Sequence, residues 1–365
     1  MINNARMLRT FLELVQIKAE SGREEAVAQH LSPRLHRLGL SVKKNGEDSS
    51  GNVIATLSPT PGRSGWIAIA AHMDTVPLEN PVKPVLRDGA IYSSGNTILG
   101  ADDRVGIASI LEALETVIEK RLPHPGIEVI FTVSEEEGLV GAKRLTSEDL
   151  QASMAFIVDS SSDPGHIVVQ APSHVNLSWI VAGKAAHAGI APEKGVNAIV
   201  AAAEGIAAMN IGRIDHETTS NVGIIRGGTA TNIVCDSVYV EGEARSFCEK
   251  KLEDLVKSMV DAMEARVAKR GASVQTKVQK SYTGFSLKET SPVVQWATSA
   301  VRRSGLLPVL ISTGGGSDAN IFNEKGLPAV NLGTGAQNVH TTKEYISERD
   351  LYTIGDIIVA IMTGA

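Results

Sequence analysis

The chain has 365 residues, 43% of them hydrophobic, which is enough for a sizeable core and favours two domains over one. Its 35 basic and 41 acidic side chains give a net charge of -6 without a basic tract, which argues against nucleic acid as a partner. No stretch approaches the roughly 18 uncharged apolar residues of a membrane span. Cys235 and Cys248 form no CxxC pair, so we expect a cytoplasmic protein with reduced thiols and no membrane partner.

Residues 1–22 carry Glu13 and Lys18 within an apolar stretch and lack a small-residue cleavage site, which indicates an amphipathic helix and not a signal peptide. Apolar runs bounded by turn residues then predict three buried strands, at residues 66–71, 127–133 and 154–158.

Between the first two strands, apolar side chains recur at helical spacing from Val105 to Ile118, and Pro123 follows that helix. This alternation of strands and helix is typical of an α/β layer fold with a mostly parallel central sheet. The active site is expected at the carboxyl ends of those strands.

The pattern changes between residues 174 and 283. The predicted order there is strand, helix, strand, strand, helix, strand, at residues 175–183, 198–209, 220–227, 233–245, 252–269 and 272–279. That βαββαβ order is typical of a ferredoxin-like α+β domain.

The chain then returns to a helix at residues 292–304, a glycine-rich turn at 313–317 and a strand at 328–332. We therefore expect a discontinuous catalytic domain, residues 1–173 and 284–365, and an inserted domain, residues 174–283.

The segment AHMDTVP places His72 at the end of an apolar strand, with Asp74 two residues further on. Side chains two apart lie on the same side of an extended chain, so Asp74 is placed to orient the ring of a metal-bound His72. A strand end followed by a polar turn explains the same letters without a metal.

The segment LGADDRVGIA puts two carboxylates, Asp102 and Asp103, at the start of the predicted helix. One acid is enough to cap a helix against its dipole. The second invites another explanation, because a carboxylate can bridge two cations with its two oxygens.

Three glutamates follow the second strand in FTVSEEEGLVGA, where a solvated charge run is the ordinary explanation. Two adjacent acids at the end of a buried parallel strand also suit a site in which one binds metal and its neighbour acts as a base. Asp159 repeats the strand-end placement, and His340 follows another apolar segment in QNVHTTKEYI.

Taken together, donors in the order His, Asp, Glu, Asp, His at successive strand ends are far more specific than any one of them. The chain resembles the M20 metallopeptidase clan, and within it the peptidase T-like group of tripeptidase relatives, over essentially its full length. The resemblance lies in AHMDTVP, LGADDRVGIA, SEEEG, IVD and NVHTTKEYI, which occur in the family's order.

The resemblance implies a hydrolase with two zinc ions per chain, Co²⁺ and Mn²⁺ being the other metals that oxygen and nitrogen donors suit. One zinc would be held by His72, Asp102 and Asp159, and the other by Glu136 and His340, with Asp102 bridging. Aligning the family pattern on Gly138 makes Glu135 the catalytic base. The family also implies a cis peptide bond between Asp102 and Asp103, a form that costs about 2.5–4 kcal/mol.

The implied reaction is attack by a metal-bridged water on a peptide bond of a short peptide, with Glu135 as general base and Asp74 holding His72. His187, in GKAAHAGIAP, resembles the histidine that the inserted domain brings to the site, often from the other subunit of a homodimer, to polarise the scissile carbonyl. A surface histidine is the alternative.

Further residues are placed like substrate-orienting groups of the family. Arg245 could pair with a peptide carboxylate or lie in a surface ion pair. STGGGSDAN lacks the Lys of a phosphate-binding loop, so its glycines are expected to bring backbone amides to the substrate. The expected substrate-binding residues are Asn232, Arg245, Gly315 and Gly316.

Two other functions stay open at this point. The clan includes aminoacylases and carboxypeptidases, which share the metal site and differ in substrate. A catalytically silent binding protein could also keep the fold, although all five ligand types and the base are present in the sequence.

Overall fold

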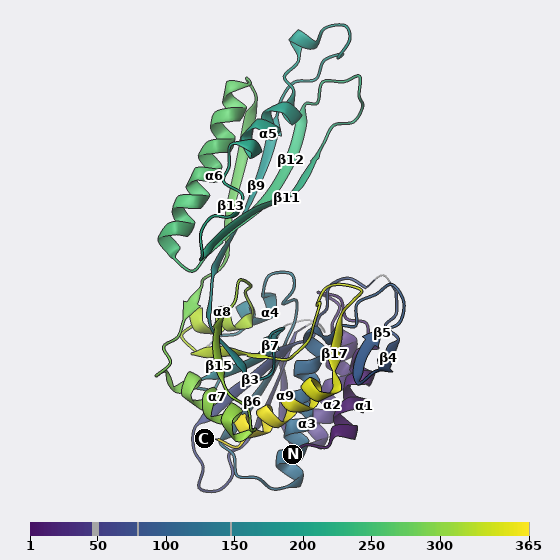
Figure 1. Ribbon diagram of the computed structural model, residues 1–365, viewed down its shortest axis with the longest axis vertical. Coiled ribbons are helices and arrows are strands. Elements are labelled where there is room, and N and C mark those ends of the chain that lie inside the picture. The colour runs from purple at the N-terminus through teal and green to yellow at the C-terminus, as the bar shows by residue number, and fades with distance from the viewer. Residues whose placement is uncertain (46–50, 79, 147, 365) are drawn as a thin grey trace. The chain divides into compact units, whose positions relative to one another are not determined.

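The computed structural model describes residues 1–45, 51–78, 80–146 and 148–364. They form two compact units, each with its own hydrophobic core (Figure 1). Unit 1 consists of Met1–Val169, Ser286–Ser312 and Ser317–Ala365, and unit 2 of Gln170–Phe285 and Thr313–Gly316.

Unit 1 is built on a nine-stranded sheet in the order β1-β2-β6-β3-β7-β16-β8-β14, with β15 paired to β8. Its middle strands, β6, β3, β7 and β16, are parallel to one another, and the outer pairs β1–β2, β2–β6 and β16–β8 are antiparallel. The predicted α/β fold with a mostly parallel central sheet is therefore confirmed. The strands are β1 (Ser41–Asn45), β2 (Asn52–Leu57), β3 (Trp66–His72), β6 (Gly126–Thr132), β7 (Ala155–Ser160), β8 (His166–Ala171), β14 (Phe285–Ser286), β15 (Val309–Ser312) and β16 (Ala329–Gly333).

The middle strands read as unbroken apolar runs because helices and strands bury both of their faces. Six of the seven residues of β3 are buried, and all seven of β6 are. Helix α3 packs against β3 and β7, and α1 and α9 pack against α3 (Figure 1). The helices of unit 1 are α1 (Asn4–Leu14), α2 (Glu25–Arg37), α3 (Ala101–Glu119), α4 (Val140–Arg144), α7 (Pro292–Arg303), α8 (Asp318–Glu324) and α9 (Glu348–Met362).

A separate three-stranded sheet of unit 1 has the order β17-β5-β4. Its strands are β4 (Pro84–Arg87), β5 (Ala90–Ser93) and β17 (Tyr345–Ser347). Tyr92 stacks on Tyr345 across this sheet, at 5.3 Å between ring centroids. β17 follows the loop that carries His340, so its pairing with β5 fixes one end of that loop.

Unit 2 has a five-stranded antiparallel sheet in the order β10-β11-β12-β9-β13. Helices α5 and α6 cover one face of it (Figure 1). The elements are β9 (Ser173–Ala182), α5 (Ala198–Ala207), β10 (Gly212–Arg213), β11 (Thr218–Gly227), β12 (Ser237–Ser246), α6 (Glu249–Lys269) and β13 (Ser273–Tyr282). Apart from the short β10, the order of elements is the expected βαββαβ.

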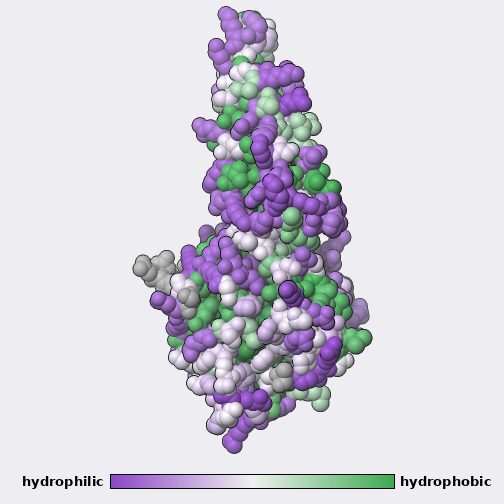
Figure 2. All heavy atoms as spheres, turned by 90° about the vertical axis from the view of Figure 1, so that its left-hand side faces the viewer, coloured by the Kyte–Doolittle hydropathy of each residue, from purple (hydrophilic) through white to green (hydrophobic). Residues whose placement is uncertain are grey.

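Buried and more exposed side chains alternate along β9 and β12, and the helices cover the face that carries the buried ones. Leu177, Trp179 and Val181 of β9 are buried together with Val238 and Val240 of β12. The face of unit 2 shown in Figure 2 is largely hydrophilic, with separate hydrophobic patches.

In the described part of the chain, no helix is both long and apolar enough to cross a bilayer.

Candidate metal centre

Strand ends of unit 1 bring together the side chains that the motifs single out. His72 is the last residue of β3, Asp159 is the next-to-last of β7, and Glu135 and Glu136 follow β6 after a two-residue link. Because β6, β3 and β7 are parallel neighbours, their carboxyl ends lie at one edge of the sheet.

The two histidines of this cluster share one carboxylate. Asp102 Oδ1 lies 3.0 Å from His72 Nε2, and Asp102 Oδ2 lies 3.2 Å from His340 Nε2. Asp159 Oδ1 is 3.5 Å from His72 Nε2, and Glu136 Oε1 is 2.7 Å from His340 Nε2. The five side chains therefore fall into two groups with Asp102 between them.

The donor atoms are close enough to hold metal ions. Donor atoms of His72, Asp102 and Glu136 lie within 4.8 Å of one another, and so do those of His72, Asp103 and Asp159. All the donors are oxygen or nitrogen, the types that Zn²⁺, Mn²⁺ and Co²⁺ accept. These donors form a candidate metal-binding site; the first group contains Asp102 and the second Asp103, and His340 belongs to neither.

The charges of the cluster also suit a metal-binding site. Burial and the neighbouring Asp102 raise the pKa of Asp159 to about 7, although its hydrogen bond with His72 acts in the other direction. Burial, followed by the charge of Asp159, raises the pKa of Glu135 well above its ordinary value. Divalent cations would relieve this crowding of buried carboxylates.

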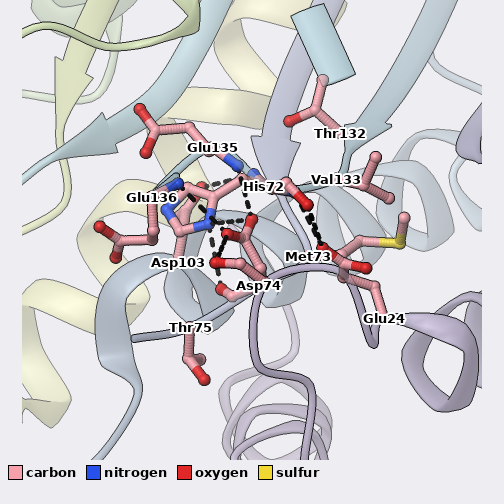
Figure 3. A network of polar contacts seen from close by, with 12 residues as sticks. Glu24, His72, Met73, Asp74, Thr75, Asp103, Thr132, Val133, Glu135 and Glu136 are labelled. Atoms are coloured by element: carbon pink, nitrogen blue, oxygen red, sulfur yellow. Dashed lines mark hydrogen bonds and ion pairs between the residues drawn. The ribbon is translucent and has the colours of Figure 1, made fainter. Parts of the chain in front are cut away.

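Asp74 contacts both His72 and the backbone of the two glutamates after β6 (Figure 3). Its carboxylate accepts hydrogen bonds from the backbone N–H groups of Glu135, at 2.9 Å, and Glu136, at 3.2 Å. Asp74 Oδ1 is also 3.3 Å from His72 Nδ1. One carboxylate thus links the histidine at the end of β3 to the two acids after β6, while Glu137 is exposed.

Asp103, which also contributes a donor atom near His72 and Asp159, binds backbone N–H groups. Its carboxylate accepts hydrogen bonds from the backbone N–H groups of His72, at 3.2 Å, and Gly106, at 2.9 Å. The peptide bond between Asp102 and Asp103 is cis, as the resemblance implies.

Buried acids that sequence reasoning missed support the loops around the cluster. Glu344 is buried, and its carboxylate accepts hydrogen bonds from the N–H groups of Leu99, Gly100 and Asp102, at 2.7, 2.7 and 3.2 Å. Asp318, also buried, accepts a 2.6 Å hydrogen bond from the hydroxyl of Thr132. Both acids lie inside segments already singled out, NVHTTKEYI and STGGGSDAN, and that position was the available signal.

Two further polar residues come from the link between α1 and α2. The hydroxyl of Ser21 donates to Asp74 Oδ2 at 2.6 Å. Glu24, which is fully buried, accepts a hydrogen bond from the backbone N–H of Ser134 at 2.8 Å. The sequence gives little signal for either residue, because they belong to a polar ESGREE run that reads as a solvated turn.

The remaining site candidates belong to unit 2. The backbone carbonyl of Asn232 accepts a 2.9 Å hydrogen bond from the N–H of Ala188, next to the exposed His187. Arg245 is bound in two directions. Its Nε and Nη2 donate to the Glu243 carboxylate at 3.2 and 2.9 Å, and its Nη1 donates to the carbonyl of Gly314 at 3.2 Å.

The glycines of this loop differ in what constrains them. A Cβ on Gly316 would lie 2.2 Å from Cζ of Tyr282, so only glycine fits there. The N–H of Gly315 donates to the hydroxyl of Thr313 at 3.2 Å.

Within unit 2, the structure separates His187 from Arg245. Arg245 pairs with His174 on β9, whereas Ser237 at the other end of β12 pairs with Ala182, eight residues along β9. His187 lies beyond that second end and bridges to Ile233. At about 3.3 Å per residue the two ends are about 26 Å apart, whereas an extended tripeptide spans about 10 Å. The two side chains of one chain therefore cannot contact the same tripeptide.

Comparisons with known proteins point to one family. The sequence profile described as "Peptidase family M20/M25/M40" matches residues 68–363. The chain is 40% identical to the uncharacterized protein YqjE of Bacillus subtilis, with all of both chains covered. Among solved structures, it is similar to a tripeptidase from Staphylococcus aureus (40% identity, TM-score 0.94, 100% and 98% of the two chains). It is also similar to aminopeptidase PepT from Bacillus cereus (43% identity, TM-score 0.89, 99% and 98%).

Proposed function

Since the chain belongs to peptidase family M20/M25/M40, as the motifs predict, we propose that it hydrolyses peptide bonds in short peptides, tripeptides foremost. The observation that carries this proposal is Asp102, which faces a histidine with each of its two oxygens. The similar solved structures include a tripeptidase and an aminopeptidase, which favours short peptides over N-acyl amino acids.

The proposed cofactors are two divalent cations per chain, zinc first, with Co²⁺ and Mn²⁺ as alternatives. His72, Asp102 and Asp159 would hold one cation, and Glu136 and His340 the other, with Asp102 shared. When bound, the pair of cations lowers the pKa of water and polarises a carbonyl oxygen.

Glu135 is the proposed general base. Its raised pKa suits a group that takes a proton from the attacking water and passes it to the leaving amine nitrogen. Asp74 orients His72 and holds the backbone of Glu135 and Glu136, so it acts on both the ligand set and the base.

The substrate groups are assigned to unit 2. Arg245 keeps N–H groups beyond those given to Glu243 and Gly314, and these would bind the carboxylate of the peptide. Asn232, Gly315 and Gly316 are the further substrate-binding residues of this proposal.

His187 would polarise the scissile carbonyl. It lies beyond the end of β12 that is about 26 Å from Arg245 by strand register, so on this proposal a tripeptide held by Arg245 needs His187 of the partner subunit. We therefore include a homodimer, formed through unit 2, in the proposal. The free thiols Cys235 and Cys248 favour a reducing, cytoplasmic location.

The test pairs Glu135→Gln with a substrate panel of tripeptides, dipeptides and N-acyl amino acids. We expect wild type to prefer tripeptides. The variant should keep its affinity for Zn²⁺ and lose roughly 10²–10⁴-fold in turnover, because only the proton transfer is removed. Glu137→Gln, an exposed neighbour, is the control. Near-normal turnover of Glu135→Gln would contradict the base assignment, and a preference for N-acyl amino acids would point to an aminoacylase.

A further inference from the structure

The link between α1 and α2 places Glu24 against Ser134, the residue before the proposed base, and Ser21 against Asp74; Figure 3 shows Glu24 beside this network. We propose that Ser21 and Glu24 are positioning residues that set the place of Glu135 and Glu136 through the backbone and through Asp74. This inference rests on the proposed function for the roles of those two acids. The family profile begins at residue 68, so it does not include this link.

Two of the hydrogen bonds of Glu24 come from Ser134, the residue just before the proposed base Glu135. Glu24 Oε1 accepts hydrogen bonds from the N–H of Ser134 at 2.8 Å, the hydroxyl of Ser134 at 3.1 Å and the N–H of Gly22 at 2.9 Å. The N–H of Gly22 also donates to the Ser134 hydroxyl at 3.0 Å. The two chain segments, more than a hundred residues apart in sequence, are thus tied at one point.

Ser134 needs this support because of its backbone conformation. Its φ is 48°, in the left-handed region that non-glycine residues seldom occupy because it is sterically unfavourable for them. The turn it makes directs the following backbone so that the N–H groups of Glu135 and Glu136 reach the Asp74 carboxylate. If Ser134 relaxed to an ordinary conformation, those two N–H groups would turn away.

Ser21 acts on the same arrangement from the other side. Its hydroxyl donates to Asp74 Oδ2 at 2.6 Å, the oxygen that also accepts the N–H of Glu136. The backbone of this link is held against the strand end as well, because the N–H of Thr75 donates to the carbonyl of Ala19 at 2.9 Å. Ser21 is therefore fixed to the segment whose carboxylate it orients.

Helix capping does not explain Glu24. It is the N-cap residue of α2, the position at which the side-chain oxygen of a Ser, Thr, Asp or Asn accepts a hydrogen bond from the first turn of the helix. Its side chain makes no such cap hydrogen bond. It is instead fully buried and turned towards Ser134, and its Oε2 has no hydrogen-bond partner among the described residues. A buried carboxylate with one free oxygen costs stability, which is understandable if the contact to Ser134 serves the site.

The experiment compares Ser21→Ala and Glu24→Ala with matched controls. Ser32→Ala removes a hydroxyl that donates to the carbonyl of Ala28 within α2, and Glu25→Ala removes an exposed acid next to Glu24. Each variant is measured for kcat and KM on a tripeptide, for Zn²⁺ affinity of the metal-free protein by calorimetry, and for Tm.

We expect Ser21→Ala and Glu24→Ala to lose roughly 10–100-fold in kcat, and Zn²⁺ affinity to fall about tenfold because Glu136 is displaced. KM should change far less than kcat. Ser21→Thr keeps the hydroxyl and Glu24→Gln keeps an acceptor oxygen, so both should recover most of the loss. The controls should match wild type.

Two results would overturn the inference. One is kcat and Zn²⁺ affinity of Ser21→Ala and Glu24→Ala equal to those of their controls. The other is an equal loss in Ser21→Thr and Glu24→Gln, since the retained contacts would then not matter. If wild type binds Zn²⁺ but hydrolyses no peptide, the proposed function fails, while the Zn²⁺ affinities still decide whether Ser21 and Glu24 position the site.

Discussion

Two inactive variants, Glu135→Gln and His187→Ala, should restore activity to each other when they form mixed dimers. Strand register puts about 26 Å between Arg245 and the end of β12 near His187, so the proposed function assigns His187 of the partner subunit to each site. In a mixed dimer, one site then has both groups intact and the other has both substituted. Random re-pairing of equal amounts makes half of the dimers mixed, so activity should return to about a quarter of wild type.

The assay measures tripeptide hydrolysis by each variant alone and after the two are dissociated and re-paired, with mixed dimers verified by native mass spectrometry. The control mixes Glu135→Gln with Glu136→Gln. These two residues are consecutive in one chain and both donate to Asp74 of that chain, so on the proposed function every site in that mixture keeps one defect and no activity should return. Equal recovery in both mixtures, or none in the first despite mixed dimers, would refute the reasoning.

Two further predictions concern packing and acid stability. Gly106→Ala would place a Cβ 2.3 Å from the carbonyl oxygen of Val158. We expect at least a tenfold loss of kcat/KM on a tripeptide, because Val158 would be displaced and the next residue, Asp159, is a proposed metal ligand. Gly355→Ala, which meets mainly the ends of flexible side chains, should stay near wild type, and similar losses in both would contradict this. His174, whose Nε2 lies 3.0 Å from Glu243 Oε2, and then Arg245 lower the pKa of Glu243 from its ordinary 4.5 to about 2, so its stabilisation is present above pH 4.5 and lost as the pH falls towards 2. Glu243→Gln should lower the free energy of unfolding by on the order of 1 kcal/mol at neutral pH after allowance for solvent screening, with the difference in Tm closing towards pH 2; a difference independent of pH would contradict it.

Sequence reasoning located the middle of the fold because β3, β6 and β7 are buried on both faces and read as apolar runs. It did not predict α2, which is polar and contains Pro33. Helix α9 was also missed, since the IGDIIVAIM run is buried nearly all round and loses its helical periodicity.

The same contrast holds for the site. Each proposed metal ligand follows an apolar strand or lies at the start of a helix, and such a position can be predicted from the adjacent residues in the sequence. Glu24 and Ser21 could not be predicted in this way, because their roles come from contacts with residues 110 and 53 positions away. Nor does local sequence indicate that His187 and Arg245 lie at opposite ends of one sheet, which only the pairing of β9 and β12 determines.

The division of the chain also affects how unit 2 can be exchanged. An ordinary inserted domain is one continuous segment of the chain and can be replaced as one segment. Unit 2 consists of two segments, because Thr313–Gly316 belongs to it although the residues on either side belong to unit 1. Tyr282 packs where a side chain on residue 316 would lie. A chimaera that takes only residues 170–285 from a relative would therefore combine the relative's residue at position 282 with Gly316 of this chain. Residues 170–285 and 313–316 have to be transferred together.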